Sequence, residues 1–318
     1  MNNKLKYHLY FPALAALLLS TTACTKGRNY NENTLETSTN LPASTSVITT
    51  EPEASMKESP IPTKVSYVNP SGTTLETRFQ LPEGYTRLSY SKDSFGEFVR
   101  KYPLCEDGSE VLLYNGSKKG NQNAHIAIFD MDLVNDDLQQ CADSVIRMYA
   151  EYFYKKKQYE LMQFHFVNGF SCDFSKWSQG MRVNIDGNST TWYQGAASDD
   201  SNKTLESYLR TVFCYASTLS LEEESKSIQL KDIQIGDIFI HGGSPGHVVM
   251  VVDVCKNKQK EKAFLLAQGY MPAQQFHILQ NPQHTDDPWY YTKDLSNALD
   301  TPEYDFTMDE LKRPTYIK

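Results

Sequence analysis

The sequence lacks several features that would assign the chain to common functional classes. It has no run of lysine and arginine long enough to grip nucleic acid or anionic lipid, and its formal net charge is −8. This acidic balance argues against a nucleic-acid partner, because nucleic-acid-binding proteins usually present a basic face. The sequence also has no Cys-x-x-Cys pair and no tight cluster of cysteine and histidine. We therefore expect no metal site and no cofactor.

The apolar run near the N-terminus is too short to span a membrane, which takes about 20 residues. It covers residues 9–19, follows two lysines, and is followed by the small residues at 20–23. A positive segment, an apolar segment and a small-residue segment in this order are typical of a secretory signal peptide. We place that signal peptide at residues 1–23.

Cys24 directly follows the small-residue segment. This arrangement resembles the lipobox of bacterial lipoproteins, in which the cysteine is acylated and becomes the new N-terminus, although Thr21 stands where a typical lipobox has leucine. The resemblance implies a lipid anchor at Cys24 and a location in the bacterial cell envelope, outside the cytoplasm. The alternative is ordinary signal cleavage, which leaves Cys24 free. Export permits disulfides, but five cysteines follow Cys24, so at least one thiol stays unpaired within the monomer.

Residues 24–63 have the composition of a disordered tether. The stretch 29–62 is dominated by Asn, Thr, Ser, Glu and Pro and has almost no large apolar residues. Such a stretch cannot bury enough surface to offset the entropy cost of ordering it. Residues 64–318 contain no second low-complexity stretch and no internal repeat. We therefore predict a single globular domain over residues 64–318.

The order of the expected elements indicates an α+β fold. Apolar residues at helical spacing predict a helix from Asp136 to about Tyr154. The last third instead contains three runs rich in β-branched residues, at 235–240, 247–254 and 263–267. Helices followed by a meander of strands are typical of an antiparallel sheet, and the helix would bury its apolar stripe on that sheet.

His247 is the first candidate for catalysis. It opens a strand directly after the glycine-rich residues 242–246, and imidazole titrates near neutral pH, so it suits the role of general base. Gln268 ends the next strand, and antiparallel pairing makes the two residues neighbours. Its side-chain oxygen is then the candidate that orients the imidazole. Asp253 is the rival acceptor, but it lies six residues along the strand, roughly 20 Å away.

Cys141 is the candidate nucleophile. It lies near the start of the predicted helix, whose dipole favours a thiolate. Under the alternative interpretation it is a plain core residue, because it falls on the apolar stripe of that helix. A helix that starts at Asp136 puts Cys141 in the second turn, whereas a break at residues 139–140 brings it into the first turn.

The block from Gly236 to Gln268 resembles the C-terminal sheet of papain-like cell-wall amidases of the NlpC and CHAP groups. These proteins have a Gly-Asp turn, then Gly-His-Val opening a strand, then a polar residue on the next strand. Gln140-Cys141 is similar to the Gln-Cys that opens a helix in CHAP amidases. The resemblance implies a papain-like fold with Cys141 as nucleophile, His247 as base and Gln268 as orienting residue, in place of the usual acidic residue, His or Asn.

The folded part also resembles, over nearly its whole length, an uncharacterised bacterial lipoprotein family, the domain of unknown function 4846. The matching stretches are residues 113–116, 120–122, 137–145, 151–152, 168–170, 173–177, 243–247 and 266–274. Two hypotheses about function follow. The first is a cysteine hydrolase that cleaves cell-wall peptides or similar amides. The second is a non-catalytic envelope protein that binds a cell-wall or protein ligand in the same cleft.

Overall fold

The computed structural model describes residues 66–316, all within one compact unit, Ile61–Lys318. The signal peptide expected at 1–23, the lipid attachment expected at Cys24 and the whole tether expected at 24–63 therefore lie outside the described residues, as does the end of the chain at 317–318. Among residues 66–316, no helix has both the length and the apolar character needed to cross a membrane.

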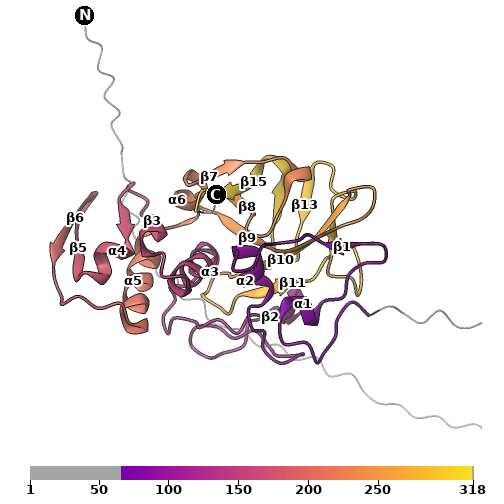
Figure 1. Ribbon diagram of the computed structural model, residues 1–318, viewed down its shortest axis with the longest axis horizontal. Coiled ribbons are helices and arrows are strands. Elements are labelled where there is room, and N and C mark those ends of the chain that lie inside the picture. Colours follow the sequence, from indigo (N-terminus) through magenta and orange to yellow (C-terminus); the bar gives the residue numbers. More distant parts are fainter. Residues whose placement is uncertain (1–65, 317–318) are drawn as a thin grey trace, which may run out of the picture. The chain divides into compact units, whose positions relative to one another are not determined.

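An antiparallel sheet forms the centre of the described part (Figure 1). Its strands follow the order β2-β11-β10-β9-β8-β15-β7, with β1 pairing with β9 and β12 with β10. The strands are β1 (Thr86–Arg87), β2 (His125–Ile128), β7 (Ser225–Ser227), β8 (Ile238–His241), β9 (His247–Lys256), β10 (Lys262–Gln268), β11 (His277–Leu279), β12 (Tyr290–Tyr291) and β15 (Leu311–Pro314). The prediction of a mixed α+β fold with an antiparallel sheet is confirmed. The finer papain-like arrangement stays a prediction.

Helices and small hairpins surround this sheet. The helices are α1 (Leu75–Arg78), α2 (Phe95–Arg100), α3 (Cys141–Lys155), α4 (Phe174–Ser178), α5 (Asn202–Tyr215) and α6 (Thr218–Glu223). The hairpins are β3–β4 (Gln163–His165 and Ser171–Asp173), β5–β6 (Met181–Asp186 and Ser189–Gln194) and β13–β14 (Ala298–Asp300 and Asp305–Thr307). Helix α3 packs on β9 and β10, so its apolar stripe faces the sheet that the sequence indicated.

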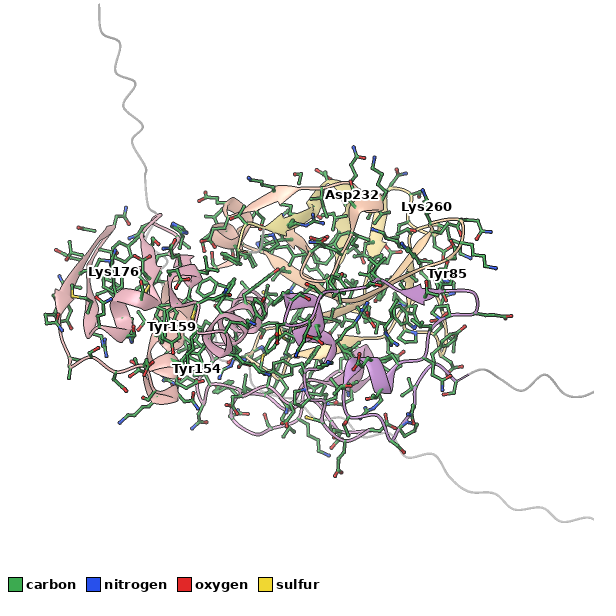
Figure 2. All side chains as sticks on the ribbon, viewed as in Figure 1. Tyr85, Tyr154, Tyr159, Lys176, Asp232 and Lys260 are labelled. Carbon is green, nitrogen blue, oxygen red and sulfur yellow. The ribbon has the colours of Figure 1, made fainter. Side chains whose placement is uncertain are left out.

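The segments from α4 to α5 pack against α3 through aromatic rings (Figure 2). Tyr154 of α3 stacks on Tyr159 with ring centroids 5.8 Å apart, and Tyr159 meets Phe174 of α4 edge to face at 5.1 Å. Lys176, in the middle of the same short helix, lies over the ring of Trp192 at 5.4 Å. Aromatic pairs in these geometries stabilise packing beyond the area that they bury. They connect the C-terminal end of α3 to the β5–β6 hairpin, which the sequence did not indicate.

Helix α3 begins at Cys141, five residues later than the sequence pattern predicted. The backbone N–H of Gln140 donates to Oδ2 of Asp143 at 3.0 Å, so Gln140 caps the helix and the chain before it runs in turns. A carboxylate that satisfies the cap N–H in this way favours a helix start at that point. The predicted start at Asp136 was wrong, and Cys141 is the first residue of the helix.

Gly269, directly after β10, lets the start of α3 approach the sheet. A Cβ atom on this residue would lie 2.5 Å from Oγ of Ser144 and 2.8 Å from the backbone oxygen of Gln140. Ser144 is in the first turn and Gln140 is the cap, so the helix start touches the bare backbone of Gly269. This close approach determines how near the start of α3, with Cys141, lies to the end of β10.

Gly269→Ala is expected to destabilise the protein by about 1–3 kcal/mol, because the added methyl group forces the first turn of α3 away from the sheet. The shift in the urea midpoint of unfolding measures this cost. Gly120→Ala is the matched control, since a Cβ there has no heavy atom within 4 Å and should change stability by less than about 0.5 kcal/mol. Equal midpoints for the two variants would contradict the close packing of α3 on Gly269.

Candidate functional site

His247 and Gln268 form a direct hydrogen bond in the interior. His247 is the first residue of β9 and Gln268 the last of β10, and the antiparallel pairing of these strands brings both to the same edge of the sheet. The Nε2–H of His247 donates to Oε1 of Gln268 at 2.8 Å. Asp253, the rival acceptor, lies near the other end of β9, where it binds Arg87 and Arg100. The side chain that holds the imidazole is therefore Gln268.

The neighbours of Gln268 fix which end of its amide faces His247. Its Nε2 donates to Oε2 of Glu303 at 2.7 Å and lies 3.4 Å from Nε2 of His277. Since the amide nitrogen is committed to these acceptors, the amide oxygen faces His247. The hydrogen of the His247 ring is then on Nε2, and Nδ1 keeps its lone pair and is free to act as a base.

The thiol of Cys141 lies against the start of β9. The backbone N–H groups of Val248, Ala142 and Cys141 itself each lower the pKa of this thiol, which places them close to the sulfur. Because Val248 directly follows His247, this contact brings the thiol to the residue next to the imidazole. The structure thus brings His247 and Gln268 into contact, and it places Cys141 near Val248, the residue that follows His247.

Two tyrosines cover this cluster. The ring centroid of Tyr270 is 4.8 Å from that of His247, and the Tyr304 centroid is 5.1 Å away. Burial is the largest cause that raises the pKa of each phenol, nearby carboxylates add to the rise, and Cys141 contributes to both, which places the rings near the sulfur as well. His247 is only 3% exposed and Cys141 only 7%. Access to the thiol therefore requires part of this cover to move.

Burial keeps both members of the Cys141–His247 pair neutral. It raises the pKa of the Cys141 thiol to about 11, the nearby Asp143 carboxylate adds to the rise, and the three backbone N–H groups oppose it. Burial lowers the pKa of His247 to about 4, against the opposing effects of the Gln268 hydrogen bond and the Glu303 charge. At pH 7 the pair is a thiol and a neutral imidazole, so any reaction must move the proton during the attack on the substrate.

Four residues of the cluster were missed in the sequence: Lys119, Tyr270, Glu303 and Tyr304. Tyr270 comes two residues after Gln268, and a search along the end of β10 for aromatic side chains would have found it. The other three lie in loops, Lys119 before β2 and the remaining pair at the turn of the β13–β14 hairpin. Neither periodicity nor a motif indicates that such loop residues reach the edge of the sheet.

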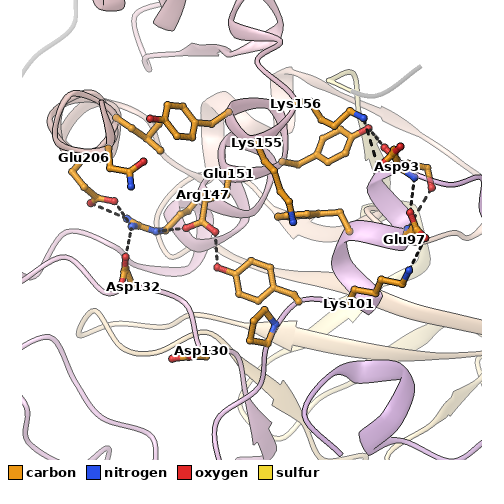
Figure 3. Close-up of a pocket in the computed structure, with 18 of the residues that line it drawn as sticks. Asp93, Glu97, Lys101, Asp130, Asp132, Arg147, Glu151, Lys155, Lys156 and Glu206 are labelled. Carbon is orange, nitrogen blue, oxygen red and sulfur yellow. Dashed lines mark hydrogen bonds and ion pairs between the residues drawn. The ribbon is translucent and has the colours of Figure 1, made fainter. Parts of the chain in front are cut away.

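A separate groove of about 640 Å³ lies between α2, α3 and α5 (Figure 3). Its lining residues, all in the described part of the chain, include no cysteine and no histidine. The guanidinium of Arg147 is bound there by the carboxylates of Glu151 and Glu206 and by Oε1 of Gln139 at 3.2 Å. Protein groups neutralise this buried cation, and its hydrogen bond to Gln139 ties α3 to the loop that leads into Cys141.

The fold and the site define an α+β protein with a buried Cys-His-Gln cluster at the edge of an antiparallel sheet. The chain belongs to the family described as domain of unknown function (4846), whose family model matches residues 75–313. No curated protein and no solved structure matches the chain. The family description gives no reaction, so function has to be argued from the cluster itself.

Proposed function

We propose that this protein is an envelope-anchored cysteine hydrolase that cleaves amide bonds in cell-wall peptides or similar substrates. The observation that carries the proposal is the cluster in which Cys141 opens α3 beside the start of β9 and His247 is tied to Gln268 through Nε2. A nucleophile, a base and a group that orients the base are the parts that such catalysis requires. The envelope location and the anchor at Cys24 rest on the sequence of residues 1–24.

In the proposed reaction the sulfur of Cys141 attacks the substrate carbonyl carbon while its proton passes to Nδ1 of His247. The proton then moves to the leaving nitrogen as the C–N bond breaks, which leaves a thioester on Cys141. Water attacks the thioester while His247 takes a proton from it. The C–S bond then breaks, the acid is released, and His247 returns the proton to the sulfur. The backbone N–H groups at the start of α3 would stabilise the negative charge on the carbonyl oxygen.

A second candidate function is a non-catalytic envelope protein that binds a cell-wall or protein ligand. The burial of Cys141 and its raised pKa favour this candidate, because inert structural cysteines share both properties. The two functions differ in the reactivity of Cys141, and that reactivity can be compared with other thiols of the same molecule. The described part contains five free cysteines: Cys105, Cys141, Cys172, Cys214 and Cys255.

Labelling with iodoacetamide at pH 7, followed by mass spectrometry of the peptides, is expected to modify Cys141 faster than the exposed Cys214, although Cys141 is buried. The reason is that His247 removes the proton as the sulfur attacks. In His247→Ala this advantage should fall at least about tenfold, while labelling of Cys214 stays unchanged. If Cys141 instead reacts as slowly as the fully buried Cys172 and Cys255, the hydrolase is wrong and the binding function takes its place.

A further inference from the structure

We infer that the ion pair of Glu303 and Lys119 positions Gln268 and thereby determines which nitrogen of His247 acts as the base. The inference rests on the proposed hydrolase function and adds two positioning residues to it. Neither residue is near Cys141, His247 or Gln268 in the sequence. Both reach the cluster from loops outside the strands that carry the imidazole and the amide.

The Glu303 carboxylate collects three donors. Its Oε2 accepts from Nε2 of Gln268 at 2.7 Å and from Nζ of Lys119, and its Oε1 accepts from Nδ2 of Asn121 at 3.2 Å. The side chains of Glu303 and Lys119 are only 14% and 6% exposed, so this pair is little screened by water. A carboxylate held in this way offers a strong acceptor at one fixed point beside the amide.

His277 closes the other side of the Gln268 amide. Its Nδ1–H donates to the backbone oxygen of Gln275 at 2.9 Å, so its Nε2 is an acceptor. That acceptor lies 3.4 Å from Nε2 of Gln268 and 3.5 Å from Nζ of Lys119. If the amide were flipped, its oxygen would face the Glu303 carboxylate and the lone pair of His277. Only the observed orientation pairs all of these groups, and it assigns the ring hydrogen of His247 to Nε2.

The same ion pair places two opposite charges near the imidazole. Glu303 raises the pKa of His247 and Lys119 lowers it, while burial dominates both. The titratable and polar groups around the ring are Lys119, Cys141, Gln268, Tyr270, His277, Glu303 and Tyr304. Removing one member of the ion pair should therefore shift the basicity of His247 in one direction, and removing the other member should shift it in the opposite direction.

The test uses the full-length protein with Glu303→Gln and Lys119→Met, and measures the iodoacetamide labelling rate of Cys141 against that of Cys214 at pH 7. Glu303→Gln is expected to slow the labelling of Cys141 several-fold, because the loss of this negative charge makes His247 a weaker base. Lys119→Met is expected to raise the labelling rate of Cys141 several-fold. The exposed Glu110 and Lys118 form a separate pair, so Glu110→Gln and Lys118→Met are the controls and should leave the rate unchanged. Two unchanged variants would overturn the positioning role.

The double variant Glu303→Leu/Lys119→Met is the alternative if a single variant does not fold. An apolar pair often replaces a buried ion pair without destabilising the protein. Long-range ¹H–¹⁵N spectra of histidine-labelled protein should then show His247 in both neutral tautomers, against only the Nε2–H form in wild type. A single Nε2–H form in a folded double variant would contradict the inference even if Cys141 is reactive. A wild-type Cys141 as inert as Cys172 would instead overturn the hydrolase, whatever the spectra show.

Discussion

Cys141→Ser and His247→Ala are each expected to reduce amide hydrolysis by about 10⁴-fold or more, and the double variant should lose little beyond that. The two side chains act as one unit in the proposed reaction, since the thiol proton passes to His247, and losses within such a unit are not additive. The measurement is the release of free amino groups from soluble cell-wall peptide fragments, followed by mass spectrometry. Cys214→Ser is the matched control, because this exposed thiol should be replaced without loss.

The pH dependence of this activity gives an independent check. The base is neutral His247, whose pKa is lowered to about 4 by burial, and the pKa of the Cys141 thiol is raised to about 11. As the pH falls through about 4, the imidazole gains a proton and can no longer accept one, so kcat/KM should fall on the acid side. Between the pKa of His247 and that of Cys141, kcat/KM should not change with pH. An acid limb near the ordinary histidine pKa of about 6.5 would contradict a buried imidazole in the reacting state.

Asp253→Ala is expected to destabilise the protein by about 3–5 kcal/mol, because it leaves two arginines without their carboxylate in the interior. Asp253 is fully buried, and its oxygens lie 2.7 and 2.8 Å from Nε of Arg100 and of Arg87. The free energy of unfolding from urea titration measures the loss. Lys101→Ala is the control, since its pair with Glu97 is exposed and should contribute less than about 1 kcal/mol. A loss below about 1 kcal/mol for Asp253→Ala would contradict the buried triad.

Two local patterns of the sequence were enough to predict part of the fold and part of the cluster. Runs of β-branched residues located β8, β9 and β10, and the short connections between them allowed little besides antiparallel neighbours. Once β9 and β10 pair in this way, the first residue of one strand meets the last residue of the other. The contact between His247 and Gln268 follows from that register alone, without knowledge of the rest of the chain.

The start of α3 depended on a contact that apolar periodicity does not report. The stripe of apolar residues extends back beyond the helix to Leu138, while the hydrogen bond between Gln140 and Asp143 decides where the helix begins. The pattern predicts which face of a helix is buried, but the cap sets its end. In this protein the difference of five residues moves Cys141 from the second turn to the first position.

Contacts between segments that are distant in the sequence could not be predicted at all. Strand β15, at the end of the described chain, lies between β8 and β7, and the β13–β14 hairpin brings Glu303 and Tyr304 to the imidazole. These contacts join segments separated by tens of residues, and their residues carry no period or spacing that marks them as partners. Their positions follow from the packing of the whole domain, which a single sequence does not reveal.

The five cysteines of the described part are all free thiols, and this affects how the protein must be handled. Since no crosslink between these residues supports the domain, reducing agents have no such bond to break, and the packing of the sheet should survive in them. A thiol reductant can therefore protect Cys141 from oxidation during purification and be removed before labelling. In a reducing medium the described region should therefore keep its fold, because its stability there does not depend on a disulfide.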